Sequence, residues 1–262
     1  MPTVILSNDL RFDSQSSRTI FESANNNGIV LEHSCLMGRC GVCMARVIRG
    51  ETSVNNTEEA LNQIQKDAGY ILTCCRTAVT DVELDIEDLG ELGDIKTKTL
   101  PCRIDSLSHL ADDVMEARLR TPAASRLYYL PGQHIVVIAK DGLRRRYSIA
   151  NAPREDGKIS LQIRKVTNGE MSRYWFDEAK TNDLLRLEGP FGTFVLRSVP
   201  KSELVLLATG TGIAPVRAML EQLAANPTKL SYRQIHVYWG GRTYEDLYWA
   251  PDYPSLSLRF VP

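Results

Sequence analysis

The first ninety positions contain three short strand-like runs, the last of which alternates between apolar and polar residues, and two stretches typical of helices. The three runs predict strands at residues 3–8, 45–51 and 82–89. A helix is expected to begin in "RTIFESA" (18–24) and to end at Gly28, and "EEALNQIQ" (58–65) is expected to form a second helix with a polar face. Short strands around two helices predict an α+β domain of the β-grasp type over residues 1–92.

The middle of the chain has the pattern of strands separated by turn residues. Five strand-like runs lie at residues 102–110, 115–121, 133–139, 145–151 and 159–166. Several short strands with turns between them are typical of an antiparallel β-barrel, so we predict a barrel domain over residues 101–198. Glycines and polar residues precede Pro101, which predicts a linker at residues 93–100.

The last sixty residues have the pattern of a parallel α/β unit. An apolar run (204–208) leads into the glycine turn at 210–212 and then into a helix with Pro215 in its first turn. Two further apolar runs predict strands at 234–239 and 256–261. Residues 199–262 are therefore predicted to form part of a Rossmann-like nucleotide domain. Three strands are few for such a domain, so we expect a C-terminally truncated one with its apolar first strand at an exposed edge. The alternative is a natural short form whose nucleotide site is defective or is completed by a partner.

Composition and charge exclude several classes of protein. The chain has 262 residues, 43% of them hydrophobic, and a formal net charge of −1, without the basic block of a nucleic-acid-binding protein. The N-terminus lacks the basic and apolar regions of a secretory signal, and the longest apolar run is far too short to span a membrane. We therefore expect a cytoplasmic protein, in which clustered cysteines are more typical of a metal or redox site than of disulfides.

Five of the six cysteines lie in two short segments, "LEHSCLMGRCGVCMARV" (31–47) and "ILTCCRT" (71–77). The spacing Cys35-x4-Cys40-x2-Cys43 with one distant cysteine is the plant-type [2Fe-2S] arrangement. A zinc ribbon would instead show two C-x2-C pairs. The first segment therefore predicts a loop that wraps an iron–sulfur cluster.

Glycines between the predicted ligands fit such a loop. Gly38 and Gly41 can adopt the unusual backbone dihedrals that wrapping a cluster requires. The distant ligand is either Cys74 or Cys75, and the resemblance to ferredoxin modules, which place their fourth ligand in "L-T-C", implies Cys74. Cys75 and Cys102 are then expected to be packing or surface thiols. The alternative is that all of these cysteines are reduced packing residues.

The segment "RRYS" (145–148) lies inside the predicted barrel and carries a second signature. Its R-x-Y-S pattern resembles that of the ferredoxin–NADP reductase-like flavoproteins. In that family the arginine, here Arg145, pairs with the FAD pyrophosphate, which suits a planar charged fork. The tyrosine, here Tyr147, flanks the isoalloxazine ring, and the serine, here Ser148, approaches flavin N5. The resemblance thus implies catalytic roles for Tyr147 and Ser148, and the alternative is an exposed basic strand.

A following segment, "NGEMSRYWF" (168–176), resembles the second FAD element of the same family. The FAD contacts implied by the two elements, beyond the three residues above, are Ile149, Gly169, Met171 and Ser172. Ser172 is also expected to cap the N-terminus of a short helix. Trp175 and Phe176 are expected to be core residues of that helix rather than cofactor contacts.

The glycine turn of the last domain completes the resemblance. "GTGIAP" (210–215) resembles the family's nicotinamide-nucleotide loop, which seats a pyrophosphate on a helix N-terminus. "YWGGR" (238–242) matches the next nucleotide segment. The implied contacts are Gly210, Thr211, Gly212, Trp239, Gly240 and Arg242. Arg242 could contact a cofactor phosphate or cap a surface turn. The resemblance favours NADH, with NADPH possible, because one arginine is insufficient evidence for a 2′-phosphate pocket.

The order of cluster, flavin and nucleotide along the chain indicates an electron pathway. Nicotinamide delivers two electrons as hydride and a [2Fe-2S] cluster accepts one, so flavin must stand between them. The chain resembles the NAD(P)H-dependent reductases that feed bacterial oxygenases and dehydrases. Segments such as "YYLPGQHI" and "HVYWG" are similar to the CDP-6-deoxy-Δ3,4-glucoseen reductases of 3,6-dideoxyhexose synthesis.

This subgroup implies that the protein electron acceptor is a pyridoxamine-phosphate-dependent sugar dehydrase. An oxygenase component, such as that of a ring-hydroxylating dioxygenase, is the alternative acceptor. Two further hypotheses are a carrier that holds FAD and the cluster without NAD(P)H turnover, and a zinc-stabilised interaction protein.

Overall fold

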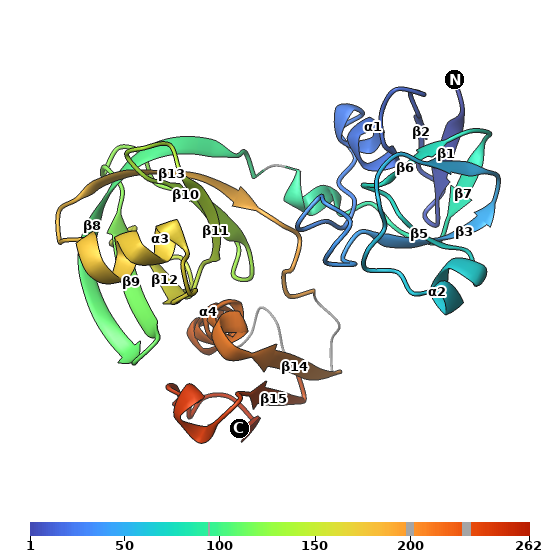
Figure 1. The fold of residues 1–262 in the computed structure, drawn as a ribbon. Helices are drawn as coiled ribbons and strands as arrows, with labels where there is room; N and C mark the ends of the chain where they lie inside the picture. Colours follow the sequence, from blue (N-terminus) through green and yellow to red (C-terminus); the bar gives the residue numbers. More distant parts are fainter. Residues whose placement is uncertain (94, 198–201, 227–231) are drawn as a thin grey trace. The chain divides into compact units, whose positions relative to one another are not determined.

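A computed structural model describes residues 1–93, 95–197, 202–226 and 232–262 (Figure 1). Residue 94, inside the predicted linker, and residues 198–201, at the predicted boundary of the second and third domains, lie outside the described residues. The chain forms two compact units. Unit 1 comprises Met1–Lys96 and Gly192–Phe194, and unit 2 comprises Thr97–Phe191 and Val195–Pro262. None of the helices in the described ranges is long and apolar enough to cross a membrane.

Unit 1 is built on a five-stranded sheet with the strand order β2-β1-β7-β3-β5. Its strands are β1 (Thr3–Leu6), β2 (Arg11–Asp13), β3 (Met44–Arg49), β5 (Tyr70–Leu72) and β7 (Val82–Leu84), and β4 (Thr52–Val54) pairs separately with β6 (Arg76–Ala78). β1 and β7 run parallel, and the other neighbours in the sheet run antiparallel. The three predicted strands are confirmed as β1, β3 and β7, although β7 is shorter than the predicted run.

The first helix of unit 1, α1 (Ile20–Asn26), begins where its sequence predicts. Thr19 and Glu22 form a capping box, in which each side chain accepts a hydrogen bond from the other residue's backbone amide. Gly28 has a φ of 74° just after the helix, as expected of a residue that ends it. The helix buries Ile20 and Ala24 in the core of the unit, against apolar residues of β1 and β7.

The second helix, α2 (Gln63–Asp67), is shorter than the predicted helix at 58–65 and starts later. Asn62 and Gln65 form its capping box, so the helix begins after Asn62. The residue at the predicted start, Glu58, is buried and accepts a hydrogen bond from the backbone of Leu72. A tertiary contact of Glu58 thus replaces the helical turn that the polar pattern predicted.

Unit 2 begins with a six-stranded antiparallel sheet of order β11-β10-β13-β8-β9-β12. Its strands are β8 (Lys98–Ala111), β9 (Val114–Arg120), β10 (His134–Ile138), β11 (Arg144–Ser148), β12 (Ile159–Arg164) and β13 (Leu184–Phe191). All five predicted strand-like runs are confirmed as strands. A bridge between Ile149 and Leu161 brings the two outer strands together beyond the end of β11. Both residues are fully buried in the core of this sheet.

The segment after β12 forms α3 (Glu170–Arg173), which continues into the π-helix η2 (Tyr174–Glu178). The prediction of Ser172 as the N-cap is wrong, because Gly169 holds that position and Ser172 lies inside the helix. The φ of 59° at Asn168 turns the preceding loop back over the helix, and the Ser172 hydroxyl accepts a hydrogen bond from Val166 N at 2.9 Å. The predicted core position of Trp175 is confirmed, and Phe176 packs partly buried against the same core.

The rest of unit 2 is a three-stranded parallel sheet of order β14-β15-β16. Its elements are β14 (Glu203–Thr209), the 3-10 turn η3 (Gly210–Gly212), α4 (Ile213–Ala225), β15 (Gln234–Gly240), the 3-10 turn η4 (Tyr244–Asp246) and β16 (Leu258–Val261). Pro215 lies in the first turn of α4, as predicted. α4 covers one face of the sheet and shares its apolar core (Figure 1). On β14, at one edge, Val205 and Leu207 remain 55% and 72% exposed.

Candidate functional site

The cysteines of unit 1 come together from two loops. Cys35, Cys40 and Cys43 lie between α1 and β3, and Cys74 lies in the turn after β5. Cys43 Sγ donates a hydrogen bond to Cys74 Sγ at 3.1 Å, and Cys40 Sγ accepts one from the Cys35 amide at 3.5 Å. All six cysteines of the chain are free thiols. The described residues bring no three His, Cys, Asp or Glu side chains together in a group that could hold one metal ion. The hydrogen bonds link Cys35 with Cys40 through a backbone amide, and Cys43 with Cys74 through their thiols.

The backbone of the first loop is shaped for close contact with the sulfur atoms. Gly38 and Gly41 have φ values of 74° and 73°, which confirms the unusual dihedrals predicted for them. A Cβ atom on Gly38 would lie 2.2 Å from the carbonyl oxygen of Thr57, so no other residue fits there without a shift. The amide of Met37 donates to Cys35 Sγ at 3.3 Å. Inward amides of this kind stabilise thiolates.

The proton distribution in the second pair favours one thiolate. The hydrogen bond from Cys43, helped by the amide of Gly38, lowers the pKa of Cys74 to about 6. Burial raises the pKa of the neighbouring Cys75 to about 12, and its Sγ lies 3.6 Å from Cys74 Sγ. Cys102 is a buried thiol of the unit 2 sheet, and burial raises its pKa to about 12 as well. Since thiolates bind metal, Cys74 is better prepared for this than Cys75.

A buried ion pair lies directly behind the Cys74 turn, and the sequence analysis missed it. Glu58 Oε1 accepts a hydrogen bond from Leu72 N at 2.8 Å. Arg76 donates from Nε to both carboxylate oxygens at 3.1 Å and from Nη2 to Oε2 at 2.9 Å. The pair thus connects the residues on both sides of Cys74. Only the presence of opposite charges 18 positions apart could have indicated it.

On the sheet of unit 2, β11 carries the residues of the R-x-Y-S pattern. Arg145 is exposed, and its Nη1 donates to the carbonyl of Arg144 at 2.8 Å. The hydroxyl of Tyr147 accepts a hydrogen bond from Trp175 Nε1 at 3.0 Å, and burial raises the pKa of Tyr147 to about 12. Tyr147 therefore stays protonated at neutral pH. Ser148 ends the strand opposite His134.

The structure brings β11 close to the second predicted FAD element through the contact between Tyr147 and Trp175. Gly169 precedes α3, and Ser172 is tied to the loop before it. The side chains of Ile149 and Met171 are buried in the apolar core. A bound cofactor would therefore meet the backbone of Ile149 and Met171 rather than their side chains.

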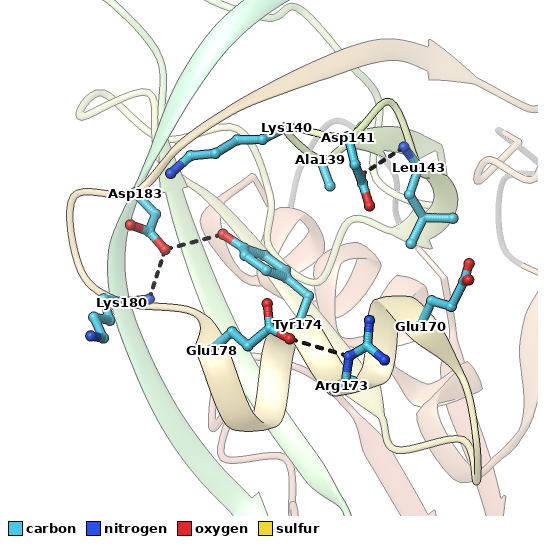
Figure 2. Close-up of a pocket in the computed structure, with 10 residues that line it drawn as sticks. All are labelled: Ala139, Lys140, Asp141, Leu143, Glu170, Arg173, Tyr174, Glu178, Lys180 and Asp183. Carbon is cyan, nitrogen blue, oxygen red and sulfur yellow. Dashed lines mark hydrogen bonds and ion pairs between the residues drawn. The ribbon is translucent and has the colours of Figure 1, made fainter.

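A pocket of about 420 Å³ opens between the β10–β11 hairpin and the helical segment of α3 and η2 (Figure 2). It is lined by Ala139, Lys140, Asp141, Leu143, Glu170, Arg173, Tyr174, Glu178, Lys180 and Asp183. Figure 2 shows the Tyr174 hydroxyl directed to Asp183, at 3.3 Å, and Arg173 paired with Glu178 at 3.2 Å. Its volume is within the range of small-molecule sites, about 300–1,000 Å³. Among its lining residues, Leu143 lies two positions before the R-x-Y-S segment and Glu170 belongs to the second predicted FAD element.

The glycine turn between β14 and α4 is held by a core tryptophan. Trp239 Nε1 donates to the carbonyl of Gly210 at 2.8 Å, while the indole ring itself is buried. Gly240 pairs with Thr209, so the ends of β14 and β15 meet at this turn. A Cβ atom on Gly212 would meet nothing within 4 Å, which leaves open space over the start of α4. The predicted glycine turn and the predicted residues Trp239 and Gly240 therefore lie together at the C-terminal ends of β14 and β15.

Two arginines near this turn are held by carboxylates. Arg242 donates to Asp246 Oδ2 from its backbone N at 2.9 Å and from Nε at 3.3 Å, and its Nη2 lies 3.5 Å from Asp113. Hydrogen bonds from Arg242, and a further one from Arg164, hold the pKa of Asp246 well below its usual range. Of the two roles predicted for Arg242, the structure thus shows it closing a turn with Asp246.

Arg164, the last residue of β12, is a candidate site residue that the sequence analysis missed. Its Nη1 lies 3.0 Å from Asp246 Oδ1 and 3.2 Å from Asp113 Oδ2. Its Nε and Nη2 are buried without a hydrogen-bond partner among the described residues, and the guanidinium lies 3.8 Å from the Cβ position of Gly210. Two donors are therefore available beside the glycine turn. A cation at the end of a strand of alternating apolar and uncharged polar residues was its signal in the sequence.

Three family models match successive parts of the chain. They are a 2Fe-2S iron–sulfur cluster binding domain at residues 5–80, an oxidoreductase FAD-binding domain at 101–196 and an oxidoreductase NAD-binding domain at 206–259. The chain is 42% identical over 258 residues to a CDP-6-deoxy-L-threo-D-glycero-4-hexulose-3-dehydrase reductase of Yersinia pestis, over 96% of this chain and 76% of that protein.

Similarity extends to reductases of oxygenase systems. The chain is 30% identical to the ferredoxin–NAD(P)(+) reductase component of the naphthalene 1,2-dioxygenase/salicylate 5-hydroxylase systems of a Ralstonia species, over 99% of this chain and 77% of that protein. Among solved structures, the Amycolatopsis cytochrome P450 reductase GcoB matches with a TM-score of 0.66 at 27% identity, over 100% of this chain and 80% of that chain.

Proposed function

Because the chain belongs to the ferredoxin reductase-like oxidoreductases, which join a [2Fe-2S] domain to FAD- and NAD-binding domains, we propose that its acceptor is the pyridoxamine-phosphate-dependent dehydrase of CDP-3,6-dideoxyhexose synthesis. The general activity is NAD(P)H-dependent electron transfer through FAD to a [2Fe-2S] cluster. One observation carries the choice of acceptor. Identity is 42% to a dehydrase reductase and 30% to a dioxygenase reductase component, each over nearly the whole chain.

The proposed domains are a β-grasp ferredoxin domain over 1–92, a linker over 93–100, a FAD barrel over 101–198 and a Rossmann-like nucleotide domain over 199–262. The last three residues of the proposed linker, 98–100, already form the start of β8. The mixed sheet of unit 1 supports the first assignment. The bridge between the outer strands of the six-stranded sheet supports the barrel. The sequence of parallel strand, glycine turn and helix in β14, η3 and α4 supports the third.

Cys35, Cys40, Cys43 and Cys74 would hold the cluster. The contacts that link Cys35 with Cys40 and Cys43 with Cys74 support a centre with two irons, each of which needs two cysteine sulfurs. The amides of Met37 and of its neighbours would stabilise the thiolate sulfurs. Hydrogen bonds to cluster sulfurs are one of the means by which a protein sets the reduction potential.

Bound FAD supplies the conversion between hydride, which carries two electrons, and the single electrons that the cluster accepts. Arg145 would bind the pyrophosphate, since its side chain is exposed and, within the described part of the chain, its guanidinium donates to the carbonyl of Arg144. Tyr147 would orient the flavin ring, and Ser148 would place its hydroxyl beside the reacting edge. The pocket of Figure 2, which continues from Leu143 past Glu170, is the proposed place for the adenosine half.

The nucleotide would bind over the glycine turn, where the small residues Gly210, Thr211 and Gly212 would let its pyrophosphate come close to the backbone. Trp239 would hold the turn in shape through its hydrogen bond to Gly210. Gly240 would leave room at the end of β15. Arg242 is paired with the carboxylates of Asp113 and Asp246, so its positive charge is already engaged and less available to the 2′-phosphate of NADPH. This supports NADH over NADPH.

The proposal is tested with protein reconstituted anaerobically with iron, sulfide and FAD. We expect NADH to bleach both flavin and cluster absorbance. Adding purified hexulose-3-dehydrase with pyridoxamine phosphate and its CDP-sugar should restore the cluster absorbance by reoxidation. A dioxygenase oxygenase component serves as the competing acceptor. Faster reoxidation by the oxygenase would overturn the proposed acceptor, and zinc in place of iron would overturn the electron pathway itself.

A further inference from the structure

The π-helix η2 places a tryptophan against Tyr147, the residue predicted to flank the flavin ring. Widened helical turns of this kind are rare and occur often at functional sites. Trp175, its second residue, is 1% exposed. A buried indole N–H usually finds a hydrogen-bond partner, and here the partner is the Tyr147 hydroxyl at 3.0 Å. The two rings meet edge to face, with centroids 6.2 Å apart and an interplanar angle of 86°.

Trp175 is itself held in place from the other side. Tyr174 packs against it with ring centroids 5.3 Å apart, and the Tyr174 hydroxyl donates to Asp183 at 3.3 Å. The indole ring belongs to the apolar core of the six-stranded sheet, whereas Tyr147 is only partly buried against that core. The hydrogen bond therefore connects a rigid residue to one at the edge of the core.

The direction of this bond matters for Tyr147. An indole nitrogen can only donate, so the tyrosine oxygen must be the acceptor and its own proton must point away from Trp175. Among the described residues no acceptor for that proton is found. The bond thus fixes the tyrosine ring and leaves its proton available to a molecule that binds at β11.

We propose that Trp175 is a positioning residue for FAD, which sets the orientation of the Tyr147 ring and hydroxyl before the cofactor binds. The proposal rests on the proposed function, in which Tyr147 flanks the flavin. A side chain that is already ordered loses less conformational freedom on binding, so preorganisation raises affinity. Trp175 has this effect through Tyr147 and does not itself contact the cofactor.

The experiment is a double-mutant cycle on the full chain. FAD affinity and the visible spectrum of bound flavin are measured for wild type, Trp175→Phe, Tyr147→Phe and the double variant. We expect Trp175→Phe to weaken FAD binding by about three- to tenfold, the value of one net hydrogen bond, and to shift the flavin spectrum. In the Tyr147→Phe background the same change should alter affinity by less than about 1.5-fold, because the acceptor is already gone.

Phe176→Leu is the matched control. Phe176 is the next residue of η2 and packs against the same core, but it has no bond to Tyr147. Its substitution should lower the melting temperature and leave FAD affinity and the flavin spectrum unchanged. Equal weakening by Trp175→Phe in both backgrounds, or none in either, would overturn the proposal, since Trp175 would then only fill the core. Failure of the wild type to bind FAD would instead overturn the proposed function.

A second measurement covers the case in which Trp175→Phe does not fold. In protein with 15N-labelled tryptophan, the indole N–H resonance of Trp175 should move when Tyr147 is replaced by Phe, and again when FAD is added to the wild type. An indole resonance that stays in place in both experiments would contradict the proposed bond and its role.

Discussion

Replacing Glu58 by glutamine tests how the fold supports the predicted cluster ligand Cys74. Glu58 is 4% exposed, and its two oxygens accept hydrogen bonds from Leu72 N and from Nε and Nη2 of Arg76. The Arg76 side chain is 19% exposed, so most of its charge is shielded from water. In the Glu58→Gln variant the amide NH2 would face the guanidinium, and Arg76 would lose its counter-charge.

The size of the effect follows from this burial. Removing one partner of a buried ion pair costs about 3–5 kcal/mol, and the partial exposure of Arg76 places the expected loss at the lower end, about 3 kcal/mol. For a unit of the size of Met1–Lys96, 1 kcal/mol corresponds to about 4–8 °C in Tm, so we expect the Tm of unit 1 to fall by about 12–24 °C.

The assay is thermal loss of cluster absorbance and of circular dichroism in the reconstituted full chain. Glu59→Gln is the control, since the next residue makes a pair of the same chemistry with Arg39 at 3.1 Å, with both side chains more than half exposed. Exposed pairs contribute about 0–1 kcal/mol, so Glu59→Gln should change little. Adding Arg76→Gln to Glu58→Gln should recover part of the loss by removing the unpaired charge. Equal Tm values for the two single variants would refute the reasoning.

Three further substitutions test other parts of the molecule. Cys74→Ser should abolish or greatly reduce bound iron while FAD stays bound, and iron loss in Cys75→Ser alone would show that the ligand choice is wrong. Ser148→Ala should retain flavin but slow its anaerobic reduction by NADH by about tenfold or more, as for loss of a positioned polar group, and an unchanged stopped-flow rate would remove Ser148 from the catalytic residues. Leu207→Lys, on the exposed face of β14, should reduce the light scattering of concentrated protein, because a charge on an edge strand opposes association. FAD affinity should not change, and unchanged scattering would contradict this prediction.

Elements that depend on local pattern could be predicted from the sequence. Five strands of the six-stranded sheet follow from strand-like runs between turn residues, and the conformations of Gly38 and Gly41 follow from the demands of a wrapping loop. Predictions failed where a tertiary contact replaced a local one. The Ser172 hydroxyl accepts from the amide of Val166 instead of capping α3, and Glu58 contacts Leu72 instead of starting α2. A single sequence gives no signal for such pairings.

The contacts between the six-stranded and three-stranded sheets of unit 2 also could not be predicted from the sequence, and they bear on function. The six-stranded and three-stranded sheets keep separate apolar cores. Polar contacts join them: Arg217 Nη1 of α4 lies 2.8 Å from the buried carboxylate of Glu116 on β9, and Glu221 accepts from the amide of Ala152 at 3.1 Å. Alternation marks Glu116 as an outward-facing polar residue and cannot show that α4 covers it. Salt screens buried ion pairs and hydrogen bonds only weakly. Because these contacts are directional, they allow fewer relative orientations of the two sheets than an apolar contact would. Since hydride transfer needs close and aligned approach, we expect the charged residues of this junction to help hold the glycine turn in position relative to the six-stranded sheet.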